Sequence, residues 1–269
     1  MIRPEYLDEK DVIENLFQLG QRKIAVEAQI TELDRVSGTA TWVLSFPDFP
    51  EAKGLVPTEE AGVEEFVMPR LVGQRIRVIV KGVDREQGLA ACSRREAVEK
   101  AKEKFVQTVK AGDVVDAAVR AVLPPAEGES APSLLLDVGG GILVRVPRME
   151  AARRRAQSLT EQYKPGQRVK AKVLSLDPLQ VSVRQAYPDP FTHVRFTRGQ
   201  EIACTVVRVW EYQTGQKVVL IEPDAAPGML GIAPAPYLGT VSRGDRVVCV
   251  VASYRPEKRQ LRCRIRGWA

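Results

Sequence analysis

The stretch of sequence that decides the fold is VGQRIRVIV, residues 72–80. A Gly-Gln pair is followed there by apolar side chains at every second position, which is the pattern of a β-strand with one buried face. Glycine suits the turn that leads into such a strand, because it adopts positive φ without a Cβ clash. The stretch therefore predicts a tight turn and then a half-buried strand.

The same phrase, glycine followed by Gln or Asp and an alternating run, recurs along the chain. Its six copies begin at Gly20, Gly73, Gly112, Gly166, Gly199 and Gly244. They form two interleaved series, 20, 112 and 199 against 73, 166 and 244, each with a period of roughly 80 to 90 residues. Because that period is the size of a small domain, the 269 residues predict three tandem units.

Each unit is predicted to contain five short strands. In the first unit they cover residues 24–31, 38–45, 53–56, 76–81 and 89–93, with a short helix at about 59–67. In the second they cover 114–123, 134–138, 142–146, 169–176 and 180–184, with a helix over about 148–163. In the third they cover 202–210, 217–221, 229–232, 246–253 and 260–266. Five strands with a helical insert before the fourth predict a mainly β chain of three oligonucleotide-binding (OB-fold) barrels, with SH3-like barrels as the alternative.

The segments between these units differ in composition. The predicted division is an N-terminal helix at 1–19, a first unit at 20–95, a helical linker at 96–110, a second unit at 111–186, a connector at 187–197 and a third unit at 198–269. In the linker, one helical face is apolar (Ala97, Ala101, Phe105 and Val109), and the alternating charges predict a solvated opposite face. The connector is too rich in proline for a helix or a strand. The N-terminal helix is expected to pack on the first barrel or on a partner.

Composition narrows the classes of function. A content of 44% hydrophobic and 28% charged residues is typical of a folded protein, and a net charge of +6 favours a polyanionic partner without requiring one. The four cysteines form no C-x-x-C pair, which predicts buried free thiols in a reducing compartment. No apolar run has the length of a signal sequence core or a membrane span, so we expect a cytoplasmic protein without a membrane partner.

Residues with catalytic potential are few. The single histidine, His193, lies in the proline-rich connector, so Ser-His or Cys-His catalysis is not expected. The glycines at 139–141 are not followed by Gly-Lys-Ser/Thr and predict a hairpin turn instead of a phosphate loop. The sequence therefore predicts a protein that is not an enzyme, with no catalytic residue, no metal site and no cofactor.

The second halves of the units resemble the S-one domain, the RNA-binding repeat of the ribosomal protein of that name. The resemblance is carried by residues 72–80 with VDR at 83–85 and CSRREA at 92–97, by YKPGQRVKAKVLSLD at 163–177, and by DPF at 189–191. It covers nearly the whole chain after the first twenty residues. It implies that RNA lies across strands two and three, where family aromatics and one histidine stack on bases.

The binding motifs of that family are only partly present in this chain. The first unit keeps one ring, Trp42, and has Pro57 where the family has its histidine; strand two of the second unit is aliphatic, and the third unit also lacks the histidine. The predicted nucleic-acid-binding residues are the rings and cations on or near the strands: Trp42, Phe46, Phe49, Lys53, Lys81, Arg145, Arg148, Arg208, Trp210, Tyr212 and Lys217. The alternative for each ring is packing in a core or between domains.

Two functions follow as hypotheses. The first is weak, sequence-tolerant and salt-dependent binding of single-stranded RNA, because contacts with phosphate groups remain when stacking rings are lost. This binding would serve translation or RNA metabolism, with the ribosome among the partners to consider. Loss of binding in Trp42→Ala or Lys217→Ala would support it. The second is a structural or assembly role, for instance in a phage particle (hence a virion location) or another large complex, where the barrels contact protein through aliphatic patches.

Overall fold

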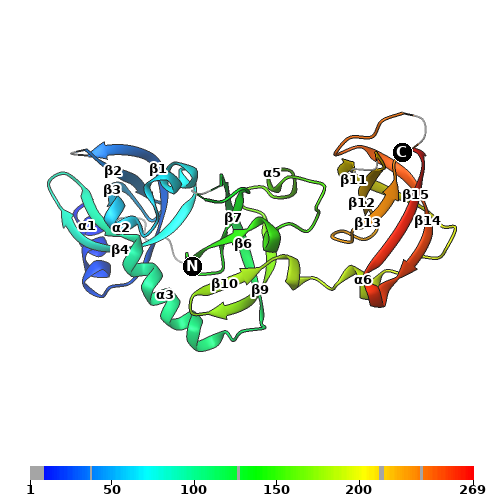
Figure 1. Ribbon diagram of the computed structural model, residues 1–269. Coiled ribbons are helices and arrows are strands. Elements are labelled where there is room, and N and C mark those ends of the chain that lie inside the picture. Colours follow the sequence, from blue (N-terminus) through cyan, green and yellow to red (C-terminus); the bar gives the residue numbers. More distant parts are fainter. Residues whose placement is uncertain (1–8, 37, 126–127, 212–214, 237–238) are drawn as a thin grey trace.

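Three β-units follow one another along an elongated chain (Figure 1). The computed structural model describes residues 9–36, 38–125, 128–211, 215–236 and 239–269. The first unit is drawn in blue and cyan, the second in green, and the third from yellow to red. Each contains one five-stranded sheet, so the predicted mainly β architecture of three OB-type units is confirmed.

The first unit is a closed barrel. Its strands are β1 (Val26–Val36), β2 (Thr39–Phe46), β3 (Phe49–Pro57), β4 (Arg75–Asp84) and β5 (Leu89–Ser93), hydrogen-bonded in the order β1-β2-β3-β5-β4. Between β3 and β4 lie α2 (Thr58–Ala61) and the 3-10 helix η1 (Glu65–Leu71), which together replace the one helix expected at 59–67. Gly62, with φ +63, ends α2 in the left-handed conformation.

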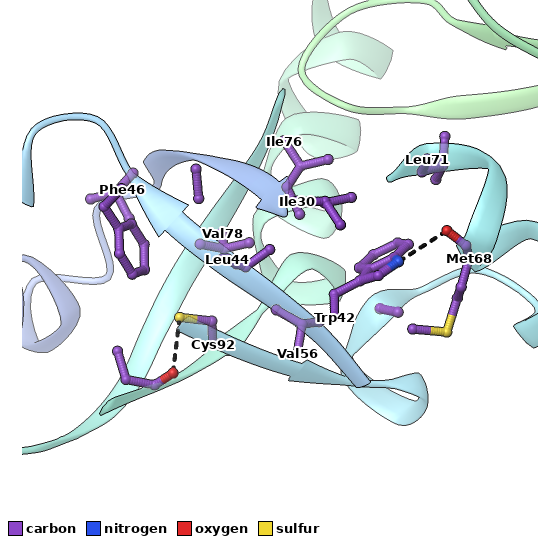
Figure 2. Close-up of a cluster of buried hydrophobic side chains, with 14 of the residues drawn as sticks. Ile30, Trp42, Leu44, Phe46, Val56, Met68, Leu71, Ile76, Val78 and Cys92 are labelled. Carbon is purple, nitrogen blue, oxygen red and sulfur yellow. Dashed lines mark hydrogen bonds between the residues drawn. The ribbon is translucent and has the colours of Figure 1, made fainter. Parts of the chain in front are cut away.

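The core of the first barrel is built from the inward positions of these strands (Figure 2). Helix α1 (Glu9–Gln21) packs against β4 and contributes Leu16, which has no exposed surface. At the end of α1, a Cβ on Gly20 would lie 2.7 Å from the carbonyl oxygen of Val80, so only glycine allows this approach. Of the two expected positions for this helix, the structure shows the one on the barrel.

The second unit has the same strand arrangement with an open seam. Its strands are β6 (Val114–Leu123), β7 (Ser133–Asp137), β8 (Leu143–Pro147), β9 (Arg168–Leu176) and β10 (Leu179–Ser182), in the order β10-β9-β6-β7-β8. In the part of the chain that the structure describes, β8 and β10 lie near each other without a ladder of hydrogen bonds. OB barrels are often partly open in this way.

The continuous helix predicted over 148–163 is wrong. Two single turns replace it, α4 (Arg148–Ala151) and α5 (Leu159–Gln162), with a loop between them. In that loop the backbone N–H groups of Arg155 and Ala156 donate to Glu222 of the third unit, so they cannot bond to helical carbonyls. Ser158 then starts α5 with a capping box that includes Glu161.

The third unit is again a closed barrel. Its strands are β11 (Glu201–Glu211), β12 (Lys217–Pro223), β13 (Gly231–Pro234), β14 (Arg246–Arg255) and β15 (Gln260–Trp268), in the order β11-β12-β13-β15-β14. The described part of its β13–β14 connection contains no helix, and the 3-10 helix η3 (Pro256–Lys258) joins β14 to β15.

The two segments between the units are helical to different extents. Helix α3 (Arg94–Thr108) begins at Ser93, whose hydroxyl accepts the N–H of Glu96, and its apolar face packs on the second unit. The expectation that the connector holds no helix is wrong. After the 3-10 helix η2 (Arg184–Ala186) it contains one turn, α6 (Pro190–His193), because Asp189 caps it and proline is compatible with the first helical position.

The four cysteine thiols are buried, and we predict that they do not react in the native protein. Burial raises the pKa of the Cys92 and Cys263 thiols to about 12, and a hydrogen bond with Cys249 together with burial raises the pKa of Cys204. Because a disulfide reagent must reach the sulfur atom and all four thiols are buried, such a reagent at pH 8 should find no reactive thiol until the chain unfolds. Titration with such a reagent should release four equivalents in denaturant, and fast native reaction would contradict the prediction.

Candidate nucleic-acid interface

Equivalent surface positions can be compared in the three units through a shared β-bulge. In each first strand the register shifts at one residue: between Ile30 and Glu32, between Val119 and Ala121, and between Val206 and Arg208. Such a bulge changes which set of alternating side chains points outward. The residue just after it begins a row of outward side chains that crosses the strands on which OB-folds bind oligonucleotides.

In the first unit this row is acidic at its start. It consists of Glu32 on β1, Val43 on β2, Leu55 on β3 and Ala91 on β5. Asp34 is the next outward residue of β1, and both carboxylates are exposed. Lys53, one of the predicted binding residues, is exposed one row away. Two carboxylates at this place oppose the approach of a phosphate backbone.

In the second unit the row is covered by the first unit. It consists of Ala121 on β6, Leu135 on β7 and Arg145 on β8. Ala121 and Leu135 are buried in the same apolar cluster as Leu71 of η1. Arg145 is half-buried, and it donates to the Ser133 hydroxyl over 2.7 Å and forms an ion pair with Glu129 over 3.0 Å. The aliphatic surface of this unit is therefore an internal joint.

Polar contacts complete the joint between the first two units. The Gln74 side chain donates to the carbonyl oxygen of Arg120, and Arg120 forms an ion pair with Asp137 over 2.7 Å. Arg94, only 2% exposed, donates to the carbonyl oxygens of Ala61 in the first unit and Gly141 in the second. Burial lowers the pKa of Arg94 to about 10, so this side chain stays charged at neutral pH.

In the third unit the row is open and basic at both ends. Arg208 on β11 lies beside Leu220 on β12, Leu220 beside Ile232 on β13, and Ile232 beside Arg262 on β15. Both arginines are exposed, Ile232 is 40% exposed, and neither arginine has an ion-pair partner among the residues that the structure describes. Trp210, half-exposed, is the next outward residue of β11.

Two rings predicted to bind nucleic acid belong to the core instead. Trp42 has no exposed surface, and its Nε1–H donates to the carbonyl oxygen of Met68 over 3.0 Å (Figure 2). Phe46 is 1% exposed, because it too points inward from β2. Phe49 is half-buried and packs edge to face against Phe46 with ring centres 6.5 Å apart. The prediction that Trp42 and Phe46 offer a stacking surface is wrong.

The remaining predicted cations are held by protein groups. Lys81 lies 2.5 Å from a carboxylate oxygen of Glu96, and this hydrogen bond raises the pKa of the ammonium group. Arg148 donates to the carbonyl oxygens of Arg155 and Gln157. Lys217 forms an ion pair with Glu211 over 3.6 Å at the far end of the β11–β12 pair.

Of the predicted residues, the structure thus brings Arg208 and Trp210 onto one open face, and Tyr212 lies outside the described residues. The residues that sequence reasoning missed are Leu220, Ile232 and Arg262. The run QLRCRIR at 260–266 carried a signal for Arg262, because arginine occupies alternate positions of that strand. We name the set Arg208, Trp210, Leu220, Ile232 and Arg262 the third-unit face.

Comparison with known proteins adds little. No family model and no curated protein matches the sequence. A solved multidomain protein with nucleic acid binding domains from Streptococcus pneumoniae is 13% identical, with a TM-score of 0.24, over 90% of this chain and 73% of that chain. A solved structure of Drosophila Unr CSD456 is 11% identical, with a TM-score of 0.22, over 91% and 97%. Likeness at this level carries no conclusion about function, and the OB assignment rests on strand order.

Two further observations concern the described part of the chain. No helix there combines the length and the apolar character needed to cross a membrane. No three side chains of His, Cys, Asp or Glu are grouped there so that they could hold a metal ion. Because its row is open and basic at both ends, the third-unit face is the candidate functional site, and its chemistry is that of two cations, a ring and two aliphatic side chains.

Proposed function

We propose that this protein binds single-stranded RNA, without catalysis, on the third-unit face. The observation that carries the proposal is the row Arg208–Leu220–Ile232–Arg262, with Trp210 beside it. The guanidinium group at each end of the row has no ion-pair partner in the part of the chain that the structure describes. Arginines at this spacing attract a phosphate backbone, and the ring and aliphatic side chains between them offer surface on which bases can pack. The equivalent rows of the other units are acidic or covered.

This face predicts weak and sequence-tolerant binding. One ring supplies about 1–3 kcal/mol of stacking free energy, so most of the affinity must come from phosphate contacts that salt screens. Binding of this kind suits a cytoplasmic role in translation or RNA metabolism. The ribosome is the first partner to test, by co-sedimentation with the full chain.

Replacing both arginines, Arg208→Gln with Arg262→Gln, is expected to weaken RNA binding at least tenfold. Because each phosphate contact to a single strand contributes about 0.7 to the slope of log affinity against log salt, the slope should fall by about 1.4. Fluorescence anisotropy of a labelled RNA of about 12 nucleotides, titrated at several salt concentrations, measures both quantities.

The matched control removes two exposed arginines of the first unit, Arg22→Gln with Arg77→Gln, neither of which has an ion-pair partner among the described residues. It changes the net charge by the same amount but away from the third-unit face, so it should leave the affinity for RNA and the salt slope unchanged. Equal loss in both double variants would show that the effect is general electrostatics and would contradict the proposed site. Single-stranded DNA of the same sequence tests whether the 2′-hydroxyl groups matter.

A role in protein assembly is the second candidate, because Leu220 and Ile232 form an apolar centre that a protein partner could equally cover. Absence of RNA binding at about 50 mM salt would favour this candidate over RNA. The aliphatic strands of the second unit give it no support, because the first unit already covers them.

A further inference from the structure

A cleft of about 620 Å³ lies where the second unit, the connector and the third unit meet. The second unit contributes Arg153, Lys172 and Arg184, the connector contributes Tyr187, and the third unit contributes loop 225–228 and Arg259. Pockets that bind small ligands in proteins have volumes of this order. The cleft is separate from the residues of the third-unit face.

The cations of this cleft are only partly neutralised. Arg184 forms an ion pair with Glu150 over 2.8 Å, and Arg259 forms one with Asp189. Arg153 and Lys172 have no acidic partner among the described residues. Two positive charges are therefore left to be matched by a ligand. Among the described residues of the lining, Asp189 alone carries a carboxylate, and Arg259 already engages it.

Arg153 is held in place by an aromatic ring. Its guanidinium carbon lies 3.6 Å from the centre of the Tyr187 ring, so the planar group stacks on the tyrosine. Stacking uses the face of a guanidinium group and leaves the N–H groups at its edge to donate. Such an arginine is suited to donate two parallel hydrogen bonds to two oxygen atoms of a phosphate group.

The walls of the cleft are joined by a buried carboxylate. Glu222 on β12 is 1% exposed, and it accepts the backbone N–H groups of Arg155 over 2.7 Å, Ala156 over 2.9 Å and Gly228 over 2.6 Å. Gly228, with φ +86, allows the third unit to approach closely, since a Cβ there would lie 3.2 Å from the carbonyl oxygen of Arg153. The cleft is therefore preorganised, which reduces the entropy lost on binding.

We propose that this cleft binds the phosphate group of a nucleotide through Arg153 and Lys172. The phosphate has two sources, a free mononucleotide or a nucleic-acid strand, and only the second rests on the proposed function. Loop 225–228 leads into β13, which carries Ile232, and Arg259 leads into β15, which carries Arg262. A strand bound on the third-unit face could thus continue toward the cleft.

The test uses the full chain and the double variant Arg153→Gln with Lys172→Gln. Calorimetric titration with inorganic phosphate and with adenosine monophosphate measures the free source, and anisotropy with labelled RNA measures the strand. The matched control is Lys170→Gln with Arg198→Gln. Lys170 is exposed two residues before Lys172 on β9, and neither control residue lines the cleft. Unchanged thermal unfolding midpoints establish that all variants are folded.

If the parent chain binds a free ligand and only the cleft variant binds it at least tenfold more weakly, the result supports the mononucleotide source. If only RNA binds, a fall of the salt slope by about 1.4 in the cleft variant and not in the control supports the strand source. Mononucleotide binding without RNA binding would overturn the proposed function and leave this inference standing. The proposed phosphate site is overturned if the cleft variant binds every probe as tightly as the parent chain does. It is also overturned if the parent chain binds none of the probes.

Discussion

Trp42→Ala is expected to lower the free energy of unfolding of the first unit by about 4 kcal/mol and to leave the affinity for RNA unchanged. The indole has no exposed surface, and it lies in the buried core of the barrel with its nitrogen toward Met68 (Figure 2). Removing it leaves a cavity and takes away the indole donor of the Met68 carbonyl oxygen. Urea denaturation measures the stability, and anisotropy of labelled RNA measures binding by the folded variant.

Trp42→Phe is the conservative comparison. It keeps most of the buried volume and removes the hydrogen bond to Met68, so the expected loss is smaller, about 1–3 kcal/mol. A folded Trp42→Ala protein with weakened RNA binding and unchanged stability would mean that this ring stacks on bases after all. Arg208→Gln with Arg262→Gln should show the opposite pattern, with binding lost and stability retained.

Glu222→Ala is expected to uncouple the third unit from the second. Three backbone N–H groups would lose their acceptor in a buried place, and one unmade hydrogen bond of this kind costs about 1–3 kcal/mol. We therefore expect the joint to lose about 3 kcal/mol or more and thermal unfolding to separate into two transitions. Hydrogen exchange at the amides of Arg155, Ala156 and Gly228 should accelerate, which mass spectrometry can measure.

Glu257→Ala is the control for the charge, because this exposed glutamate of η3 has no ion-pair partner in the part of the chain that the structure describes. Glu222→Gln should show an intermediate loss of stability and an intermediate rate of exchange. The carbonyl oxygen of the new amide can still accept a hydrogen bond, whereas its NH₂ group faces other donors. Unchanged exchange at the three amides in Glu222→Ala would show that the units are held together by other contacts.

The strands could be predicted from the sequence because burial on alternate positions is a local pattern. Residues 89–93 and 114–123 were expected as strands with the limits that β5 and β6 have. The helix expected at 148–163 failed for a reason that no local pattern contains. Its middle residues bond to Glu222, which lies 67 residues further along the chain from Arg155.

The candidate site was harder to predict than the fold. Trp42 and Trp210 both stand in alternating strands, and only the registers show that the first points inward from β2 while the second points outward from β11, beyond its bulge. Arg262 and Ile232 come together through the parallel pairing of β13 and β15, which are 26 residues apart at their closest ends. Bulges and non-local pairings decide which residues share a face.

The joint between the first two units explains the side chains on the outward row of the second unit. Its lack of aromatic side chains at Ala121, Leu123 and Leu135 suggests a binding module that has decayed. Here those small and aliphatic groups are the contact on which a neighbour sits, and bulky rings would push that neighbour away. Small and aliphatic side chains at these positions are thus a requirement of the joint, and aromatic substitutions there would separate the first two units before they created a place for a base.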